Sequence, residues 1–178
     1  TYTAVSLEDP NHQWELFNGE LREKPPMSYG HNRVMTRLGV KLMRLLSEDE
    51  FEVRVNAGRL QHGERNYYIP DIMVIPAHVT ARLQENPASL EVYTEPMPLV
   101  VEIWSPSTGL YDIDDKLREY QARGDLEIWR LHPHERTLTA WRRRSDGGYD
   151  ESFQKGGVVH PVGLPNVTVD LDDLLNLG

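Results

Sequence analysis

The chain has 178 residues, with 19 Lys and Arg against 28 Asp and Glu, which gives a formal net charge of −9 at pH 7. This length fits one domain, and 39% hydrophobic with 26% charged residues excludes intrinsic disorder and a membrane span as starting hypotheses. The acidic balance argues against loose binding of nucleic acid over the whole surface but allows a local phosphate site. The absence of cysteine excludes disulfides, thiolate zinc sites and cysteine nucleophiles. With no secretory leader after Thr1, we expect a cytoplasmic protein.

The first predicted element is a β-hairpin over residues 14–23, because two alternating stretches flank Asn18-Gly19, a pair that tolerates the positive φ angles of a tight turn. Ser28 then caps a predicted helix that runs to about Ser47. Its apolar residues recur at helical spacing and predict a buried face: Val34, Leu38, Leu42 and Leu45 or Leu46.

The remaining pattern predicts strands with one further long helix. Strands are expected over residues 52–60 and 67–75, then a short helix or irregular crossover within 78–96, and a central strand over 98–104. A helix over residues 111–123 ends at Gly124. The C-terminal part predicts a strand pair over 126–131 and 138–143, a short strand over 167–169 and a final short helix to Leu177. This order is typical of an α/β fold with a mixed sheet.

Two acidic residues interrupt apolar strands: Asp71 follows Pro70 at the start of residues 72–75, and Glu102 lies within residues 99–104. A buried, unpaired carboxylate is costly, and two that converge at ~5 Å repel by ~3 kcal/mol at an effective dielectric of ~20. A hard divalent cation such as Mg²⁺ takes oxygen ligands and would relieve this repulsion. On this reasoning Asp71→Asn leaves the melting temperature intact or raises it.

The helix after Glu102 carries Asp112, Lys116 and Tyr120 at i, i+4 and i+8, so these three side chains share one face. If this face meets the carboxylates, the Lys116 ammonium can stabilise charge that develops on a phosphate. The spacing by itself favours an ordinary solvated pair between Asp112 and Lys116, since such pairs are common on helix surfaces.

Nearly the whole chain resembles the Uma-two family of restriction endonuclease-like proteins, a domain-of-unknown-function family (DUF820) within the PD-(D/E)XK nuclease superfamily. The segments that carry the resemblance, in order and spacing, are residues 14–16 and 19–21, Pro25-Pro26 with His31, Pro70-Asp71, residues 99–108, Asp112 with Lys116, Leu117 and Tyr120, Gly124 with Glu127 and Trp129, residues 163–165 and residues 169–171.

The resemblance implies a single restriction-endonuclease-like domain over residues 1–178: a mixed β-sheet core flanked by helices, with an N-terminal β-hairpin and additional C-terminal strands. It also implies that Asp71, Glu102 and the backbone carbonyl of Ile103 hold Mg²⁺ or Mn²⁺. The superfamily pattern would place a lysine two residues after the glutamate, where this chain has Trp104. Superfamily members of this kind can supply the lysine from the following helix, and Lys116 is the matching residue.

By the same resemblance, Glu20 and His31 are secondary site candidates near the cleft, together with Asp112 and Tyr120. For His31, a purely structural role at a helix terminus is an equal alternative, since one histidine does not define a set of ligands.

Three further motifs have a functional and an ordinary interpretation. His132 and His134 suggest a zinc pair, but the proline between them favours a hairpin loop. Residues 142–144 are three arginines that suit either a phosphate contact or a solvated strand end. Residues 105–108 lack the pattern of a nucleophile elbow and are interpreted as a loop before the next helix.

These observations predict a Mg²⁺- or Mn²⁺-dependent DNA endonuclease that hydrolyses phosphodiester bonds by in-line attack of a metal-activated water. Asp71 and Glu102 would be the ligands and Lys116 the electrostatic stabiliser. The alternatives are a non-catalytic nuclease fold that binds nucleic acid or a protein, and a hydrolase of a different phosphate ester. A homodimer is expected by analogy. The sequence has no glycine-rich loop of the kind that binds phosphate, so we expect no nucleotide cofactor. We also expect no membrane partner.

Overall fold

The computed structural model describes residues 1–107 and 110–178, and the side chains of residues 110–112 also lie outside the described part. In chain order its elements are α1 (Tyr2–Glu8), β1 (Trp14–Phe17), β2 (Glu20–Glu23), α2 (Tyr29–Leu45), β3 (Phe51–Val55), β4 (Arg59–His62), β5 (Asn66–Tyr68), β6 (Ile72–Pro76), α3 (Ala77–Gln84), β7 (Val92–Tyr93), β8 (Leu99–Ile103), α4 (Leu110–Arg123), β9 (Glu127–His132), β10 (Thr137–Arg143), β11 (Tyr149–Lys155), β12 (Val158–Val159), β13 (Val169–Asp170) and α5 (Leu171–Leu174).

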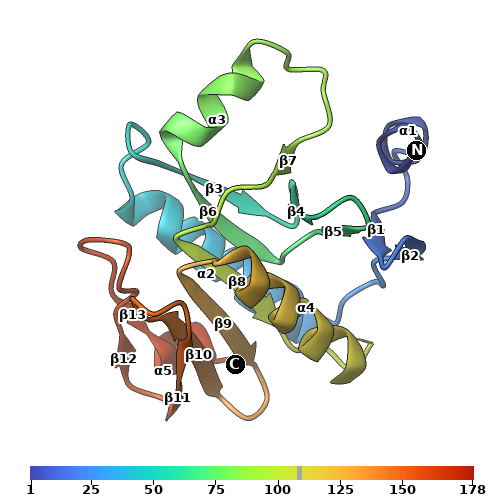
Figure 1. Cartoon of the computed structure of the whole chain (residues 1–178). Helices are drawn as coiled ribbons and strands as arrows, with labels where there is room; N and C mark the ends of the chain where they lie inside the picture. The colour runs from blue at the N-terminus through green and yellow to red at the C-terminus, as the bar shows by residue number, and fades with distance from the viewer. Residues whose placement is uncertain (108–109) are drawn as a thin grey trace.

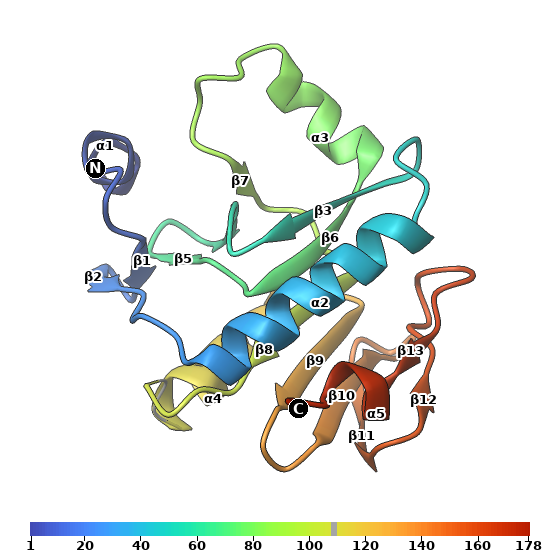
Figure 2. The same ribbon diagram turned by 180° about the vertical axis from the view of Figure 1, so that it is seen from behind.

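The strands form a six-stranded mixed sheet in the order β11-β10-β9-β8-β6-β3 and a five-stranded sheet in the order β2-β1-β5-β4-β7. β12 and β13 pair separately. Figures 1 and 2, drawn from opposite sides, show α2 along one face of the six-stranded sheet and α4 along the other. The predicted mixed sheet flanked by helices, the N-terminal hairpin and the additional C-terminal strands are therefore confirmed.

β8 lies at the centre of the larger sheet, as predicted, antiparallel to β6 and parallel to β9. Since side chains alternate along a strand, Leu99, Val101 and Ile103 pack into the core shared with α2. Val100 points to the opposite core, which contains Tyr120 of α4. The parallel pair requires a crossover, and α4 makes it.

The predicted strands over residues 52–60 and 67–75 are wrong as single strands, because each is divided between the two sheets. The first breaks at Asn56 and Gly58, whose φ angles of 49° and 72° are left-handed and interrupt the extended chain between β3 and β4. The second breaks between β5 and β6 at residues 69–71. Alternation along the sequence looks the same in both sheets, so it does not reveal the breaks.

Both predicted long helices are confirmed. The Ser28 hydroxyl caps α2 by accepting a hydrogen bond from the His31 amide at 3.3 Å. Leu46, and not Leu45, completes the buried face of α2. α4 ends before Gly124, whose φ of 82° suits glycine. The final helix is confirmed as α5, capped by Asp170, but it is shorter than predicted.

Four elements were not predicted: α1 at the N-terminus, the two-residue strands β7 and β12, and β11, which pairs with β10 along seven residues. The β11 side chains are mostly exposed, so this strand lacks an apolar alternation. In the described part of the chain, no helix has the length and apolar character to cross a bilayer.

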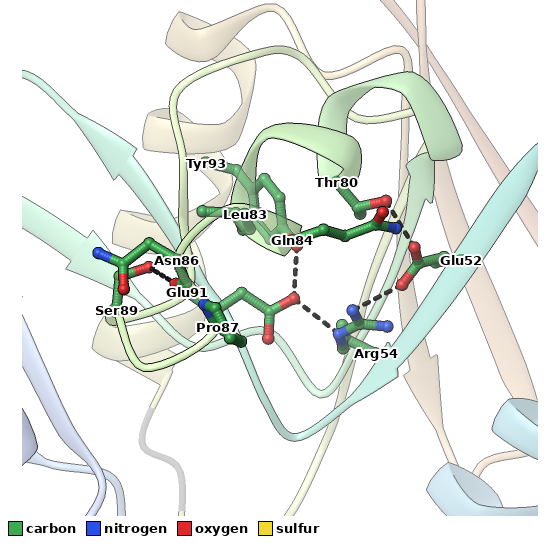
Figure 3. Close-up of a pocket in the computed structure, with 10 residues that line it drawn as sticks. All are labelled: Glu52, Arg54, Thr80, Leu83, Gln84, Asn86, Pro87, Ser89, Glu91 and Tyr93. Atoms are coloured by element: carbon green, nitrogen blue, oxygen red, sulfur yellow. Dashed lines mark hydrogen bonds and ion pairs between the residues drawn. The ribbon is translucent and has the colours of Figure 1, made fainter.

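An ion-pair network attaches the α3–β7 segment to β3 (Figure 3). The Arg54 guanidinium donates to Glu91 at 2.7 Å and to Glu52 at 2.6 Å. The Thr80 hydroxyl also donates to Glu52, and this hydrogen bond holds the pKa of that carboxyl below its usual value. Tyr93 donates to Glu91. Because one guanidinium bridges carboxylates from two different segments, the pocket they line is a structural junction.

The contact between α2 and β3 yields a prediction at Gly39, where an added Cβ would lie 2.5 Å from Val55 Cγ2. Alanine normally stabilises a helix relative to glycine by ~1 kcal/mol. Here the clash outweighs that gain, so we expect Gly39→Ala to destabilise the protein by about 1–3 kcal/mol in urea denaturation. Thr36→Ala, at an exposed α2 position, is the matched control and is expected to be neutral or stabilising. Equal effects of the two substitutions would contradict the close packing.

Candidate functional site

Asp71 and Glu102 lie opposite each other at the same end of two neighbouring antiparallel strands. The register of β6 and β8 pairs Ile72 with Val101, so the next positions outward are Asp71 and Glu102. Both residues are buried. The structure therefore brings together the two acidic residues that interrupt apolar strands in the sequence.

Both oxygens of Asp71 accept hydrogen bonds from buried donors. Lys24 Nζ lies 2.9 Å from Oδ1, while His31 Nε2 and the amide of Ile103 lie 2.8 and 2.7 Å from Oδ2. Since an ionised carboxylate only accepts, His31 carries its proton on Nε2 in this arrangement.

Lys24 and His31 keep the Asp71 carboxylate ionised. Burial alone would raise the pKa of this carboxyl, but the Lys24 ammonium and the His31 ring nitrogen outweigh burial and hold the pKa well below its usual value. Asp71 is thus a permanently ionised carboxylate at neutral pH.

Glu102 has weaker compensation. Tyr120 donates a 2.6 Å hydrogen bond to Glu102 Oε1, and Lys116 Nζ is 3.7 Å from the same oxygen. Burial, reinforced by the Asp71 charge and opposed by Lys116, raises the pKa of Glu102 to about 7. When Glu102 ionises, its negative charge is therefore less well compensated by neighbouring groups than that of Asp71.

Glu15 of β1 forms a third acidic contact and connects the hairpin to the centre. Glu15 Oε1 lies 2.8 Å from Lys116 Nζ and accepts the amide of Ile69 at 2.7 Å. Lys24 Nζ donates to the carbonyl of Ile69 at 2.9 Å. The short connection between β5 and β6 therefore contacts a carboxylate and an ammonium through the amide and the carbonyl of one residue.

We call this set the charged centre: Glu15, Lys24, His31, Asp71, Glu102, Lys116 and Tyr120. Its side chains are almost completely buried, and that of Glu102 is 11% exposed. Buried charges require partners, and each acidic residue here has at least one lysine within 4 Å.

Of the secondary candidates, His31 and Tyr120 join the charged centre through Asp71 and Glu102. Glu20 is exposed on β2 and pairs in register with Phe17, so the structure does not bring it to the centre. The side chain of Asp112 lies outside the described residues. At Ile103 the structure shows the amide bonded to Asp71, and the proposed role of its carbonyl stays a prediction.

Sequence reasoning missed Glu15 and Lys24. Glu15 carries the same signal as Asp71 and Glu102, an acidic residue between apolar ones in a strand. Lys24 stands between the hairpin and Pro25-Pro26, and no spacing rule singles it out. Only the fold brings its ammonium to Asp71, 47 residues away in the chain.

Trp104 and the three other sequence motifs are held by contacts within the protein. Trp104, at the position where the superfamily pattern has lysine, stacks on His132 with ring centroids 4.3 Å apart. The predicted hairpin loop after His132 is confirmed by the antiparallel pairing of β9 and β10. Arg142 pairs with buried Glu127 at 3.0 Å, and Arg144 pairs with carboxylates near its own turn. The hydroxyl of Ser105 ties its loop to the start of α2 by accepting the amide of Ser28.

In the described part of the chain, no group of three or more His, Cys, Asp or Glu is arranged to hold a metal ion. Asp71 and Glu102 nevertheless suit Mg²⁺, which proteins commonly bind through one or two carboxylates while water and phosphate oxygens complete the shell. The incomplete compensation of Glu102 fits a cation at that side chain.

In the absence of metal, removing the charge of Glu102 and removing the charge of Asp71 are expected to change stability in opposite directions. Since the pKa of Glu102 is about 7 in the folded protein and near 4.5 in the unfolded chain, the folded state binds more protons between these pH values. Stability therefore falls as pH rises through this window, by roughly 3 kcal/mol, and Glu102→Gln removes that loss. In EDTA at pH 8 we expect Glu102→Gln to melt above the wild type.

Asp71→Asn is expected to melt lower, which corrects the sequence-based expectation of a neutral or raised melt. The stability that Asp71 contributes is present above its unfolded pKa of about 3.8 and is lost as pH falls toward its lower folded pKa. At pH 8 the substitution leaves the Lys24 ammonium buried without its carboxylate, at a cost of about 3–5 kcal/mol. Thermal melts at pH 5 and 8 measure both effects, with exposed Glu20→Gln as control. Equal shifts for both variants would contradict the charge assignment.

Comparison with known proteins agrees with the predicted family and fold. The family model Uma2, described as "Putative restriction endonuclease", matches residues 1–172. The fold is similar to the crystal structure of a "putative nuclease belonging to DUF820" from Anabaena variabilis, with a TM-score of 0.76 and 16% identity over 91% of this chain and 89% of that one. No protein with a curated description matches the sequence. The predicted family is confirmed: with the model covering nearly its whole length, the chain belongs to the Uma2 family of restriction endonuclease-like proteins.

Proposed function

We propose that this protein is a Mg²⁺- or Mn²⁺-dependent DNA endonuclease, with Asp71 and Glu102 as metal ligands and Lys116 as the electrostatic stabiliser. One observation carries the proposal: two buried carboxylates lie opposite each other on adjacent strands, with a lysine from the following helix beside the second. Membership of a nuclease-like family supports phosphodiester hydrolysis as the reaction.

The reaction would be hydrolysis of a phosphodiester. A water oxygen forms a bond to phosphorus, the bond to one sugar oxygen breaks, and that oxygen leaves with a proton. A divalent cation held by Asp71 and Glu102 would supply Lewis-acid polarisation of the phosphate and a lowered pKa for water.

The protein's own residues would hold the charges in place. Lys24 and His31 keep Asp71 ionised and fix both of its oxygens. Tyr120 orients Glu102 from α4. These contacts would hold the two carboxylates in position before the substrate binds. Electrostatic catalysis requires this kind of preorganisation.

Lys116 is positioned between two acidic residues. Its Nζ lies closer to Glu15 than to Glu102, at 2.8 against 3.7 Å. Glu15 thus holds the ammonium beside Glu102, where it would stabilise the negative charge that grows on the phosphate. This arrangement explains how the centre would work with Trp104 at the usual lysine position.

A non-catalytic binding module is the alternative, and the depth of the charged centre favours it. No side chain of Asp71, Glu102 or Lys116 is more than 11% exposed. A protein that binds DNA with salt-dependent affinity but does not cut it under either metal would support this alternative.

Lys116→Met tests the proposed electrostatic role. Removing the ammonium is expected to reduce the rate of DNA cleavage by about 100-fold, since groups that stabilise transition-state charge contribute on this scale. Cleavage of supercoiled and single-stranded DNA with Mg²⁺ or Mn²⁺ measures the rate, and Lys116→Arg should retain more activity than Lys116→Met.

Lys155→Met, on exposed β11, is the control and should cleave like the wild type. Calorimetry with Mn²⁺ checks that the Lys116 variants still bind the cation. An unchanged cleavage rate in a folded Lys116→Met protein would remove Lys116 from the mechanism.

A further inference from the structure

A surface pocket of about 340 Å³ adjoins the charged centre at Lys24. It is lined by residues from the segment before β1, from the connection between β2 and α2, and from the residue that follows β3. Pockets of this size hold small organic groups. Lys24 lines the pocket while its Nζ lies 2.9 Å from Asp71, so one side chain separates the pocket from a proposed metal ligand.

Side-chain amides dominate the polar lining, contributed by Asn11, Gln13, Asn32 and Asn56. Gln13 Nε2 donates to the carbonyl of Asn56 at 2.9 Å, and Asn56 Oδ1 accepts from Lys24 at 2.8 Å. These bonds fix both amides to the backbone and to the charged centre. In the part of the chain that the structure describes, Gln13 Oε1 and Asn56 Nδ2 have no hydrogen-bond partner. Two of the lining amides therefore each keep one polar group, an acceptor on Gln13 and a donor on Asn56, that no described residue engages.

The rest of the lining includes less polar side chains. Pro25, Pro26 and Met27 follow Lys24 directly and line the same pocket. Proline rings and a methionine thioether pack well against the face of an aromatic ring. A flat heterocycle with donors and acceptors along its edge matches both parts of this lining.

Charge excludes a phosphate as the occupant. The Glu23 carboxylate, 53% exposed, lines the pocket and would repel an anion. The Lys24 ammonium is bonded to Asp71, Asn56 and Ile69, and its side chain is 3% exposed. A carboxylate that repels phosphate can still accept a hydrogen bond from the exocyclic amino group of a base.

We propose that this amide pocket binds an unpaired nucleobase of the DNA next to the phosphodiester held at the charged centre. The inference rests on the proposed function and extends it: the substrate would be single-stranded or locally opened DNA. In an intact duplex the bases are paired and stacked, so none can enter a pocket of this size without leaving the helix.

The test separates base recognition from backbone recognition. Two fluorescent single-stranded oligonucleotides are compared in EDTA, one intact and one with a run of abasic sites and the same number of phosphates. We expect the wild type to bind the intact strand at least fivefold more tightly. Gln13→Met, which loses the amide but keeps the side-chain length, should reduce that ratio to below twofold.

Asn11→Ala is a second variant for the case that Gln13→Met fails to fold, because the Asn11 side chain is exposed and has no bond among the described residues. It should reduce the ratio in the same direction. Gln84→Met, an exposed amide at the end of α3, is the matched control and should keep the wild-type ratio. Equal binding of both strands by the wild type, or an unchanged ratio in folded Gln13→Met and Asn11→Ala, would overturn the inference.

The outcome is independent of cleavage, because EDTA prevents any metal-dependent reaction. A base-dependent ratio that the pocket variants abolish, together with no cleavage under Mg²⁺ or Mn²⁺, would support the pocket and refute the proposed nuclease. Metal-dependent cleavage without a base-dependent ratio would support the nuclease and refute the pocket.

Discussion

The burial of ionised groups at the junction of two sheets is the constraint on which this structure depends. Asp71 ends the connection from the five-stranded sheet and directly precedes β6 of the six-stranded one. Its carboxylate would be costly there without Lys24 and His31, which come from the loop after β2 and from α2. The charges therefore connect elements from both sheets and from α2, and the same contacts define the candidate active site.

The arrangement also shows where the charged centre departs from the lysine position that the sequence resemblance implies. Trp104 takes the position of the usual lysine and packs on His132, where it completes an aromatic contact and contributes no charge. The ammonium comes instead from Lys116, one turn of α4 before Tyr120, and both side chains reach Glu102. The crossover helix α4 thereby places beside Glu102 a lysine that the central strand β8 does not contain.

Most residues of the charged centre could be predicted from the sequence, because local patterns single them out. Acidic residues within apolar strands identified Asp71 and Glu102, and helical spacing placed Lys116 and Tyr120 on one face. The division of two predicted strands between the sheets was not visible, since alternation continues across the left-handed turn at Asn56. Lys24 could not be found for a different reason: its role depends on a long-range contact that no local pattern encodes.

The most direct test of the central claim compares the wild type with Glu102→Gln in cleavage of supercoiled plasmid with Mg²⁺ or Mn²⁺. The substitution keeps the size of the side chain and removes the charge that would hold the cation. The account predicts nicked or linear DNA with the wild type, no cleavage in EDTA and none with the folded variant. Cleavage by Glu102→Gln at the wild-type rate, or a folded wild type that binds Mn²⁺ and cuts no DNA, would contradict it.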